Sequence, residues 1–302
     1  MKFKKKNILI VGGTGFIGYH LAKRCLKKFN VFSLSLSKPK KKRNLKKVKY
    51  LFGNLRNIKS LNQLNKIKFD YVVNGGGYVD HVNKIRTYES HFKSSVNLYN
   101  YFKERDLIAF VQLGSSAEYG KRESPLNERV STKPKDIYGK AKLLASNFLL
   151  EKYRKYSFPV IILRFFQIYG PNQDSNRFIP FVINECLNNQ NFDCSPCTQK
   201  RDFLFIDDAV DAILLSLRVK KAIGQIINIG DGKPIILKTV IKKIIKIIKK
   251  GKPQFGKIKL RSDESKIIYP DLKKVKKILN WQSKSDFNKN LNKTIKYYKK
   301  IK

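Results

Sequence analysis

A tyrosine and a lysine four residues apart, Tyr138 and Lys142, are the pair in this sequence best suited to acid–base chemistry. Residues at this spacing lie on one face of a helix. A neighbouring ammonium stabilises a phenolate, so we expect the pKa of Tyr138 to lie below its usual value of about 10. Ser115 and Ser116 follow an apolar run and can hydrogen-bond a reacting oxygen beside Tyr138. Together these residues predict a proton-transfer site, in which Ser115 is preferred over Ser116.

A second candidate for chemistry is a glycine-rich segment near the start of the chain. It satisfies the pattern G-x-G-x-x-G, follows the apolar run Asn7–Val11 and precedes a segment of helical periodicity. In that setting glycines allow a tight turn and a close backbone approach, and the helix N-terminus receives a pyrophosphate. We therefore predict a dinucleotide site formed by Gly12, Gly13, Thr14, Gly15, Phe16, Ile17 and Gly18.

The residues at the end of the next strand indicate which dinucleotide binds. An acidic residue about 20 residues after the glycines binds the ribose 2′-hydroxyl of NAD. Here the run Val31–Leu36 ends among serines and lysines, with no acidic residue. Hydroxyls and cations suit a 2′-phosphate, so we predict NADP(H) in preference to NAD(H), with contacts from Ser35, Ser37 and Lys38.

Strand and helix signals alternate through the first half of the chain. Such alternation implies parallel βαβ units and an α/β fold, a Rossmann doubly wound parallel sheet with helices on both faces. The predicted strands are Asn7–Val11, Val31–Leu36, Val48–Phe52, Asp70–Asn74, Leu107–Leu113 and Val160–Phe166. The predicted helices are Phe16–Lys28, Ser60–Lys66, Thr87–Arg105 and Asp136–Tyr156.

The alternation loosens after about Gly170, where prolines and polar residues become frequent. We expect an NAD(P)-binding domain over residues 1–169. Residues 170–302 should form mainly a smaller substrate-binding lobe, with some segments returning to the sheet. The lobe should cover the crevice at the carboxyl ends of the strands, where such sheets bind ligands.

The chain carries a large positive charge, because 65 Lys and Arg residues face 22 Asp and Glu residues and leave a net charge of +43. The lysines are spread along the whole chain, so we interpret them as a solvated surface. Attraction of an anionic substrate or of polyanions is the alternative. The segment 237–248 places its apolar residues on one helical face, which indicates a surface helix, with an interfacial membrane helix as the alternative.

Sequence signals for secretion, membrane insertion and metal binding are weak. No apolar run approaches the ~18–20 residues of a membrane span, and the basic start lacks a cleavage site. Four cysteines make no disulfide framework, so we expect a cytoplasmic protein. Cys194 and Cys197 form half of a zinc-ribbon spacing, and His20, His81 and His91 share no ligand spacing. No metal site is predicted.

Further segments accompany these motifs, among them Leu163–Pro171, Thr198–Phe203 and Leu279–Trp281. With them the chain resembles, nearly end to end, the extended short-chain dehydrogenase/reductase superfamily, in its nucleotide-sugar epimerase/dehydratase/reductase group. The resemblance implies a nucleotide-diphosphate sugar as substrate and a homodimer. It implies that Tyr138 exchanges the proton at a sugar hydroxyl or ketone, that Lys142 holds the nicotinamide ribose, and that Ser115 faces the substrate. It also implies that Arg201 contacts the diphosphate, that Asn54 lies near the adenine, and that the substrate lies near Ser116, Gln167 and Asn176.

Departures from the family pattern reduce the number of reactions to be expected of this chain. Family dehydratases place Asp-Glu directly after the serine, where this chain has Ser116 and Ala117, which disfavours dehydration. Gln167 and His91 stand where many members have asparagine. Two segments, Val72–Tyr78 and Leu113–Gly120, most resemble reductases and epimerases of 6-deoxysugar nucleotides, such as CDP-abequose or CDP-paratose synthases.

We therefore expect an NADPH-dependent reductase of a 4-keto-6-deoxy nucleotide sugar, acting in deoxysugar and surface-polysaccharide (O-antigen) biosynthesis. The first alternative is an NAD(P)-dependent nucleotide-sugar 4-epimerase, which would use the same residues and keep its cofactor. The second is a non-enzymatic nucleotide- or RNA-binding protein on the same fold, suggested by the charge alone. No specific nucleic acid partner is expected.

Overall fold

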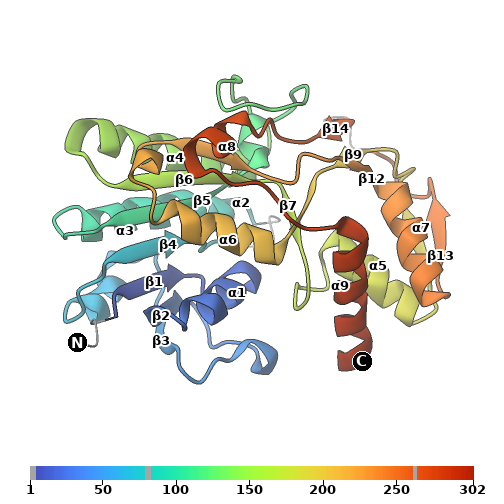
Figure 1. Ribbon diagram of the computed structural model, residues 1–302, viewed down its shortest axis with the longest axis horizontal. Coiled ribbons are helices and arrows are strands. Elements are labelled where there is room, and N and C mark those ends of the chain that lie inside the picture. Colours follow the sequence, from blue (N-terminus) through green and yellow to red (C-terminus); the bar gives the residue numbers. More distant parts are fainter. Residues whose placement is uncertain (1–4, 79–82, 261–263) are drawn as a thin grey trace.

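The computed structural model describes residues 5–78, 83–260 and 264–302. Its centre is a parallel sheet of seven strands in the order β11-β6-β5-β4-β1-β2-β3 (Figure 1). The strands are β1 (Asn7–Val11), β2 (Asn30–Ser35), β3 (Lys49–Phe52), β4 (Tyr71–Asn74), β5 (Ala109–Ser115), β6 (Val160–Phe165) and β11 (Ile226–Ile229). The doubly wound α/β sheet expected from the sequence is confirmed.

Helices cover both faces of the sheet because successive side chains of each strand point to opposite faces. Ile8 and Ile10 of β1 pack on the side of α1 and α6, whereas Leu9 and Val11 pack on the side of α3 and α4. These helices are α1 (Phe16–Cys25), α3 (Ser94–Phe102), α4 (Ile137–Tyr156) and α6 (Ile206–Ser216).

The predicted strands form within two residues of their expected bounds, and the helical segments differ more. The segment near residue 60 is a 3₁₀ helix, η2 (Ile58–Leu64). The expected helix Thr87–Arg105 is composite, because a π-helical turn, η3, interrupts it between α2 and α3. Further short helical elements are η1 (Lys41–Arg43), α2 (Lys84–Tyr88), η3 (Glu89–Lys93), η4 (Ser116–Tyr119) and η5 (Lys220–Ala222).

A lobe of short strands and helices lies beside the sheet, on the right in Figure 1. Its small sheets pair β7 (Gln167–Tyr169) with β10 (Phe203–Phe205), β8 (Asn191–Cys194) with β13 (Lys252–Phe255), and β9 (Lys200–Arg201) with both β12 (Ile235–Ile236) and β14 (Ile267–Ile268). Its helices are α5 (Phe178–Leu187), α7 (Leu237–Ile248) and α9 (Phe287–Ile301), and α8 (Lys273–Leu279) packs against β11.

The amphipathic segment is the helix α7, and its apolar face is buried. Val240, Ile241, Ile244 and Ile248 belong to the large core cluster that also includes Ile8 and Ile10 of β1, so the surface-helix interpretation is confirmed. None of the helices in the described part of the chain is long and apolar enough to cross a membrane. The start of the chain at residues 1–4 and His81, both considered above, lie outside the described residues.

Candidate active site

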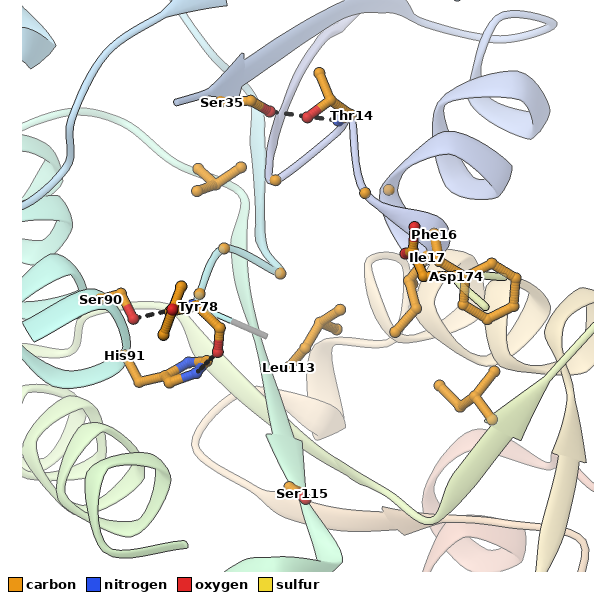
Figure 2. A pocket seen from close by; sticks show the side chains of 18 of the residues that line it. Thr14, Phe16, Ile17, Ser35, Tyr78, Ser90, His91, Leu113, Ser115 and Asp174 are labelled. Atoms are coloured by element: carbon orange, nitrogen blue, oxygen red, sulfur yellow. Dashed lines mark hydrogen bonds between the residues drawn. The ribbon is translucent and has the colours of Figure 1, made fainter. Parts of the chain in front are cut away.

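A cavity of about 850 Å³ opens at the carboxyl ends of the central strands, between the sheet and the lobe. Figure 2 shows Ser35 and Thr14 at one end of it and Ser115 at the other. Most of the side chains predicted from the sequence therefore meet in one place. The predicted residues that line the cavity are Gly12, Thr14, Gly15, Phe16, Ile17, Gly18, Ser35, Ser37, Lys38, Asn54, Ser115, Ser116, Tyr138, Lys142, Gln167 and Asn176.

The glycine loop between β1 and α1 leaves no room for larger residues. Gly12 has a φ of +76°, and a Cβ there would lie 2.9 Å from the Gly75 carbonyl oxygen. A Cβ on Gly18 would lie 2.3 Å from the Gly12 carbonyl oxygen. Gly13 does not line the cavity but packs against Ser33 of β2, where a Cβ would lie 2.3 Å from the hydroxyl oxygen.

The first turn of α1 is suited to an anion. Gly15 is its N-cap, no side chain caps the turn, and the turn holds no acidic residue. Its backbone N–H groups and the helix dipole therefore remain available to a negatively charged group in the cavity. The cavity continues from this turn to Tyr138 and Lys142, so its residues fit a nicotinamide dinucleotide.

The ends of β2 and β3 carry a hydroxyl group and an amide group, and neither strand end has an acidic residue. The Ser35 hydroxyl oxygen accepts a hydrogen bond from the Thr14 backbone N–H at 3.3 Å (Figure 2). The Asn54 side-chain oxygen accepts from both the backbone N–H and the Nε of Arg56 at 3.2 Å. Lys38 lines the same end of the cavity as these residues. This end therefore carries neutral and positive groups.

The proton-transfer residues lie at the other end. Asp136 caps α4 by accepting from the Gly139 N–H at 2.8 Å, which places Tyr138 in the first turn and Lys142 one turn later. A side-chain hydrogen bond joins Tyr138 to Ser115 at the end of β5. The ammonium of Lys142 donates to the Leu113 carbonyl oxygen at 2.8 Å.

The expected lowering of the pKa of Tyr138 is wrong for this arrangement. Burial raises the pKa of Tyr138 above its usual value, and the hydrogen bond from Ser115 only partly offsets this. The ammonium of Lys142 lies 5.9 Å from the centroid of the Tyr138 ring. Burial also lowers the pKa of Lys142 to about 8.

Contacts between two distant segments cross the cavity near α1. The guanidinium of Arg43 is 3% exposed; its Nη2 donates to the Asn172 carbonyl oxygen at 2.7 Å and pairs with Asp174 Oδ2 at 3.0 Å. Lys40 pairs with Asp174 Oδ1 at 3.0 Å. Burial opposes ionisation of Asp174, but the two cations outweigh it and hold its pKa below the usual value. We call these contacts the cross-groove bridge.

Sequence reasoning also missed a histidine in the cavity wall. The ring of His91 lies edge-on to that of Tyr138, with 5.1 Å between centroids, and its Nε2 lies 3.2 Å from the Tyr78 carbonyl oxygen. A Cβ on Gly77 would lie 1.9 Å from this ring, so the glycine makes room for it. Many family members have asparagine at this position, so the departure at His91 was the signal available in the sequence. The π-helical turn that carries His91 was not predictable.

Arg201 lies outside the lining of this cavity and pairs with Glu264 at 2.6 Å. Its contact with a diphosphate stays a prediction. The four cysteines are free and buried. Within the described ranges, no three histidine, cysteine or acidic side chains converge as a metal site would require.

Comparison with known proteins agrees with this geometry. Residues 8–230 match the model of the NAD dependent epimerase/dehydratase family. The chain is 27% identical to an uncharacterized UDP-glucose epimerase, YtcB, of Bacillus subtilis, over 96% of this chain and 97% of that one. It is 33% identical to dTDP-D-glucose 4,6-dehydratase of Dictyostelium discoideum, over 80% of this chain and 62% of that one.

Solved structures share the fold. An epimerase from Methanothermobacter thermautotrophicus superposes with a TM-score of 0.92 at 20% identity, over 99% of this chain and 93% of that one. The UDP-glucose 4-epimerase of Thermotoga maritima superposes with a TM-score of 0.92 at 21% identity, over 98% and 99% of the two chains. The family match and the glycine, serine, tyrosine and lysine positions give one conclusion: the chain belongs to the NAD dependent epimerase/dehydratase family.

Proposed function

We propose that this protein is a nucleotide-sugar 4-epimerase that retains its nicotinamide cofactor through the catalytic cycle. The observation that carries the choice is the cross-groove bridge, which joins the segment after β2 to the lobe beside the glycine loop. A reductase must release oxidised cofactor at every turnover, whereas an epimerase returns the hydride to the sugar. A cofactor that is kept in the cavity by the ion pairs of the cross-groove bridge suits the cycle of an epimerase.

Relatives support the same choice. They include a putative UDP-glucose 4-epimerase of Methanocaldococcus jannaschii and the UDP-glucuronate 4-epimerase of Thermodesulfobacterium geofontis. The site also lacks the Asp-Glu pair that the family pattern assigns to dehydratases. Ser116 and Ala117 carry no acid, and Glu118 is buried in an ion pair with Arg164. Among the described residues that line the cavity, Asp174 is the one acidic side chain, and both of its oxygens are paired.

The bound cofactor supplies a hydride acceptor at C4 of the sugar and a positive charge that lowers the pKa of Tyr138. Tyr138 takes the proton from the 4-hydroxyl and returns it to the same oxygen after the sugar has presented its other face. The Ser115 hydroxyl, bonded to Tyr138, stabilises that oxygen. Lys142 holds the nicotinamide ribose within the buried end of the cavity.

We further propose that Ser35, Ser37 and Lys38 bind a 2′-phosphate, so that NADP(H) binds more tightly than NAD(H). The support is the absence of a carboxylate at the end of β2 and the Ser35 hydroxyl directed at the loop of Thr14. Ser116, Gln167 and Asn176, which line the lobe side of the cavity, contact the nucleotide sugar. The placement in a cytosolic, reducing compartment rests on cysteine usage alone and stays a prediction.

We also propose a homodimer. α2 and α4 pack against each other, and their surfaces expose Ile85 and Leu144 at 75% and 42%. Two such helices from each copy bury this apolar surface. Light scattering after gel filtration tests the dimer, and Leu144→Glu should give a monomer.

The function is tested by incubating the purified protein with NAD(P)⁺ and a panel of nucleotide sugars, and with NADPH and 4-keto-6-deoxy nucleotide sugars. An epimerase converts one C4 epimer into the other without net loss of cofactor. Stoichiometric loss of NADPH on a 4-keto substrate establishes the reductase predicted from the sequence instead. Binding of RNA at physiological salt in competition with nucleotide sugar, without turnover, supports the non-enzymatic alternative.

A further inference from the structure

A carboxylate is buried directly beneath the candidate site. Glu118 of η4 is fully buried, and Arg164 of β6, 2% exposed, donates from Nε to its Oε2 at 2.8 Å. A buried ion pair seldom adds net stability, because removing both charges from water costs about as much as their attraction returns. A fully satisfied pair can, however, fix the elements that it joins.

This carboxylate joins the elements that carry the proton-transfer residues. Oε1 accepts the backbone N–H of Ser115 at 2.8 Å, at the end of β5. Oε2 accepts the hydroxyl of Ser146 at 2.9 Å, in addition to Arg164. Ser146 lies on α4, one and two turns beyond Lys142 and Tyr138 and on the same side of the helix. One carboxylate therefore holds the strand end of Ser115 against the catalytic face of α4.

Neighbouring residues leave this carboxylate a single position. A Cβ on Gly114 would lie 2.6 Å from Glu118 Oε1, so the glycine provides its space. On the other side, the Arg164 guanidinium lies 4.7 Å from the centroid of the Tyr119 ring. The Tyr119 hydroxyl in turn donates to the Asn228 side-chain oxygen of β11 at 2.8 Å.

We infer that Glu118, held by Arg164, is a positioning residue that fixes the Ser115 hydroxyl relative to the Tyr138 phenol, so that both reach the same substrate oxygen. The inference deepens the proposed function and rests on it for its turnover measurement. The ionised form is needed because three donors point at two oxygens. Glutamine would direct an amide NH₂ at one or more of them and leave donors unpaired.

The charge of Glu118 also gives a measurement that does not depend on turnover. Tyr138 is surrounded by Glu118 and Asp136, whose charges raise its pKa, and by Arg177, whose charge lowers it, with Lys142 and His91 beside its ring. The hydrogen bond from Ser115 lowers the pKa of Tyr138 by more than the charge of Glu118 raises it. Loss of the charge alone would therefore lower this pKa, whereas loss of the charge together with release of Ser115 should raise it.

The test compares Glu118→Gln with Glu151→Gln, a change on the exposed side of α4 where Glu151 pairs with Lys155. We expect Glu118→Gln to lower kcat by about 10- to 100-fold, because small misplacements of reacting groups have effects of this size. KM and cofactor Kd should stay within about twofold, and Glu151→Gln should match the unmodified protein in all three. If Glu118→Gln does not fold, Ser146→Ala removes one donor only and should lower kcat by about threefold to tenfold.

Ultraviolet pH titration supplies the second measurement. The titration of Tyr138 is obtained by subtracting the spectrum of the Tyr138→Phe protein in each background. It should move to higher pH in Glu118→Gln, because the larger effect of the Ser115 hydrogen bond is lost along with the charge. Unchanged kcat overturns the inference, and so does a titration that moves to lower pH, because Glu118 then acts through its charge and not by positioning Ser115. So does a loss of kcat that only follows the loss of folded protein. If the unmodified protein converts none of the nucleotide sugars, the proposed function fails, and the titration alone decides the inference.

Discussion

The guanidinium of Arg43 donates to the carbonyl oxygen of Asn172 at 2.7 Å, although 129 positions separate the two residues along the chain. The segment after β2 is thereby attached to the lobe segment after β7. A second contact, between His20 Nε2 of α1 and the Pro171 carbonyl oxygen at 2.9 Å, fastens the same lobe segment to the helix behind the glycine loop.

Loss of the cross-groove bridge should release the cofactor faster. Asp174→Asn removes the charge that pairs with Lys40 and Arg43, and we expect release to accelerate about threefold to tenfold, the range for one or two partly buried polar contacts. Stopped-flow fluorescence of bound reduced cofactor measures this rate. Asp211→Asn, which breaks the exposed pair with Arg24, serves as the control. Equal release from both variants and the unmodified protein would exclude the bridge from cofactor retention.

Tyr138→Phe should abolish proton transfer and leave cofactor binding intact. We expect kcat to fall by about 100-fold or more, since a positioned acid–base group contributes that much, while the phenyl ring keeps its contact with His91. Steady-state kinetics and calorimetric titration of the cofactor measure the two effects. Activity within a few-fold of the unmodified protein would remove Tyr138 from the mechanism.

Ser35→Asp should reverse the cofactor preference. A carboxylate at the end of β2 repels a 2′-phosphate and accepts from a ribose 2′-hydroxyl, so the ratio of NADP(H) to NAD(H) affinity should fall about tenfold or more. Calorimetry of the apoprotein with both cofactors gives the ratio. Lys38→Met is the comparison, because it removes a cation from the same end of the cavity without adding a negative charge. If the unmodified protein binds both cofactors equally, the proposed 2′-phosphate site is wrong.

Lys142→Met should stabilise the fold at neutral pH while it impairs turnover. Burial lowers the pKa of Lys142 to about 8 from 10.5 in the unfolded chain, so the unfolded state binds more protons between these values. The free energy of unfolding of the unmodified protein therefore rises with pH across this range. At pH 7 the buried ammonium costs about 3 kcal/mol, an upper limit for the gain in Lys142→Met.

Denaturant unfolding at pH 7 and at pH 10 checks this expectation. The advantage of Lys142→Met should be present at pH 7 and should shrink toward pH 10, where the folded protein no longer carries the charge. Lys155→Met, on the exposed side of the same helix, should show neither effect. An advantage that does not change with pH would mean that packing, and not the charge, is responsible.

Local patterns in the sequence were sufficient for six of the seven strands of the sheet, for the glycine loop and for the Tyr138–Lys142 pair, but not for β11. Each depends on residues within one element or on one turn, and periodicity and spacing record those directly. The π-helical turn that brings His91 to Tyr138 leaves no comparable pattern. Nor do pairs such as Arg43 with Asp174, since only the folded chain brings them together.

The pKa of Tyr138 illustrates the same limit. The spacing of Tyr138 and Lys142 correctly predicted that both lie on one face of a helix. It could not predict that the phenol is buried or that the Glu118 carboxylate lies near it. Both raise the pKa, and Lys142 points instead to the Leu113 carbonyl oxygen. Electrostatic effects depend on depth and neighbours in three dimensions, which spacing does not encode.

The position of β11 has a consequence for synthesis of the chain on the ribosome. β6 is complete at Phe165, but its outer neighbour β11 begins only at Ile226, about 60 residues later. At a synthesis rate of about 5–20 residues per second, the backbone edge of β6 stays unpaired for about 3 to 12 s before β11 is made. During that interval the apolar strand Val160–Phe165 is an open edge of the kind that pairs with other chains. We expect a fragment ending at residue 169 to aggregate, and the nascent chain to depend on chaperones until residue 229 has emerged.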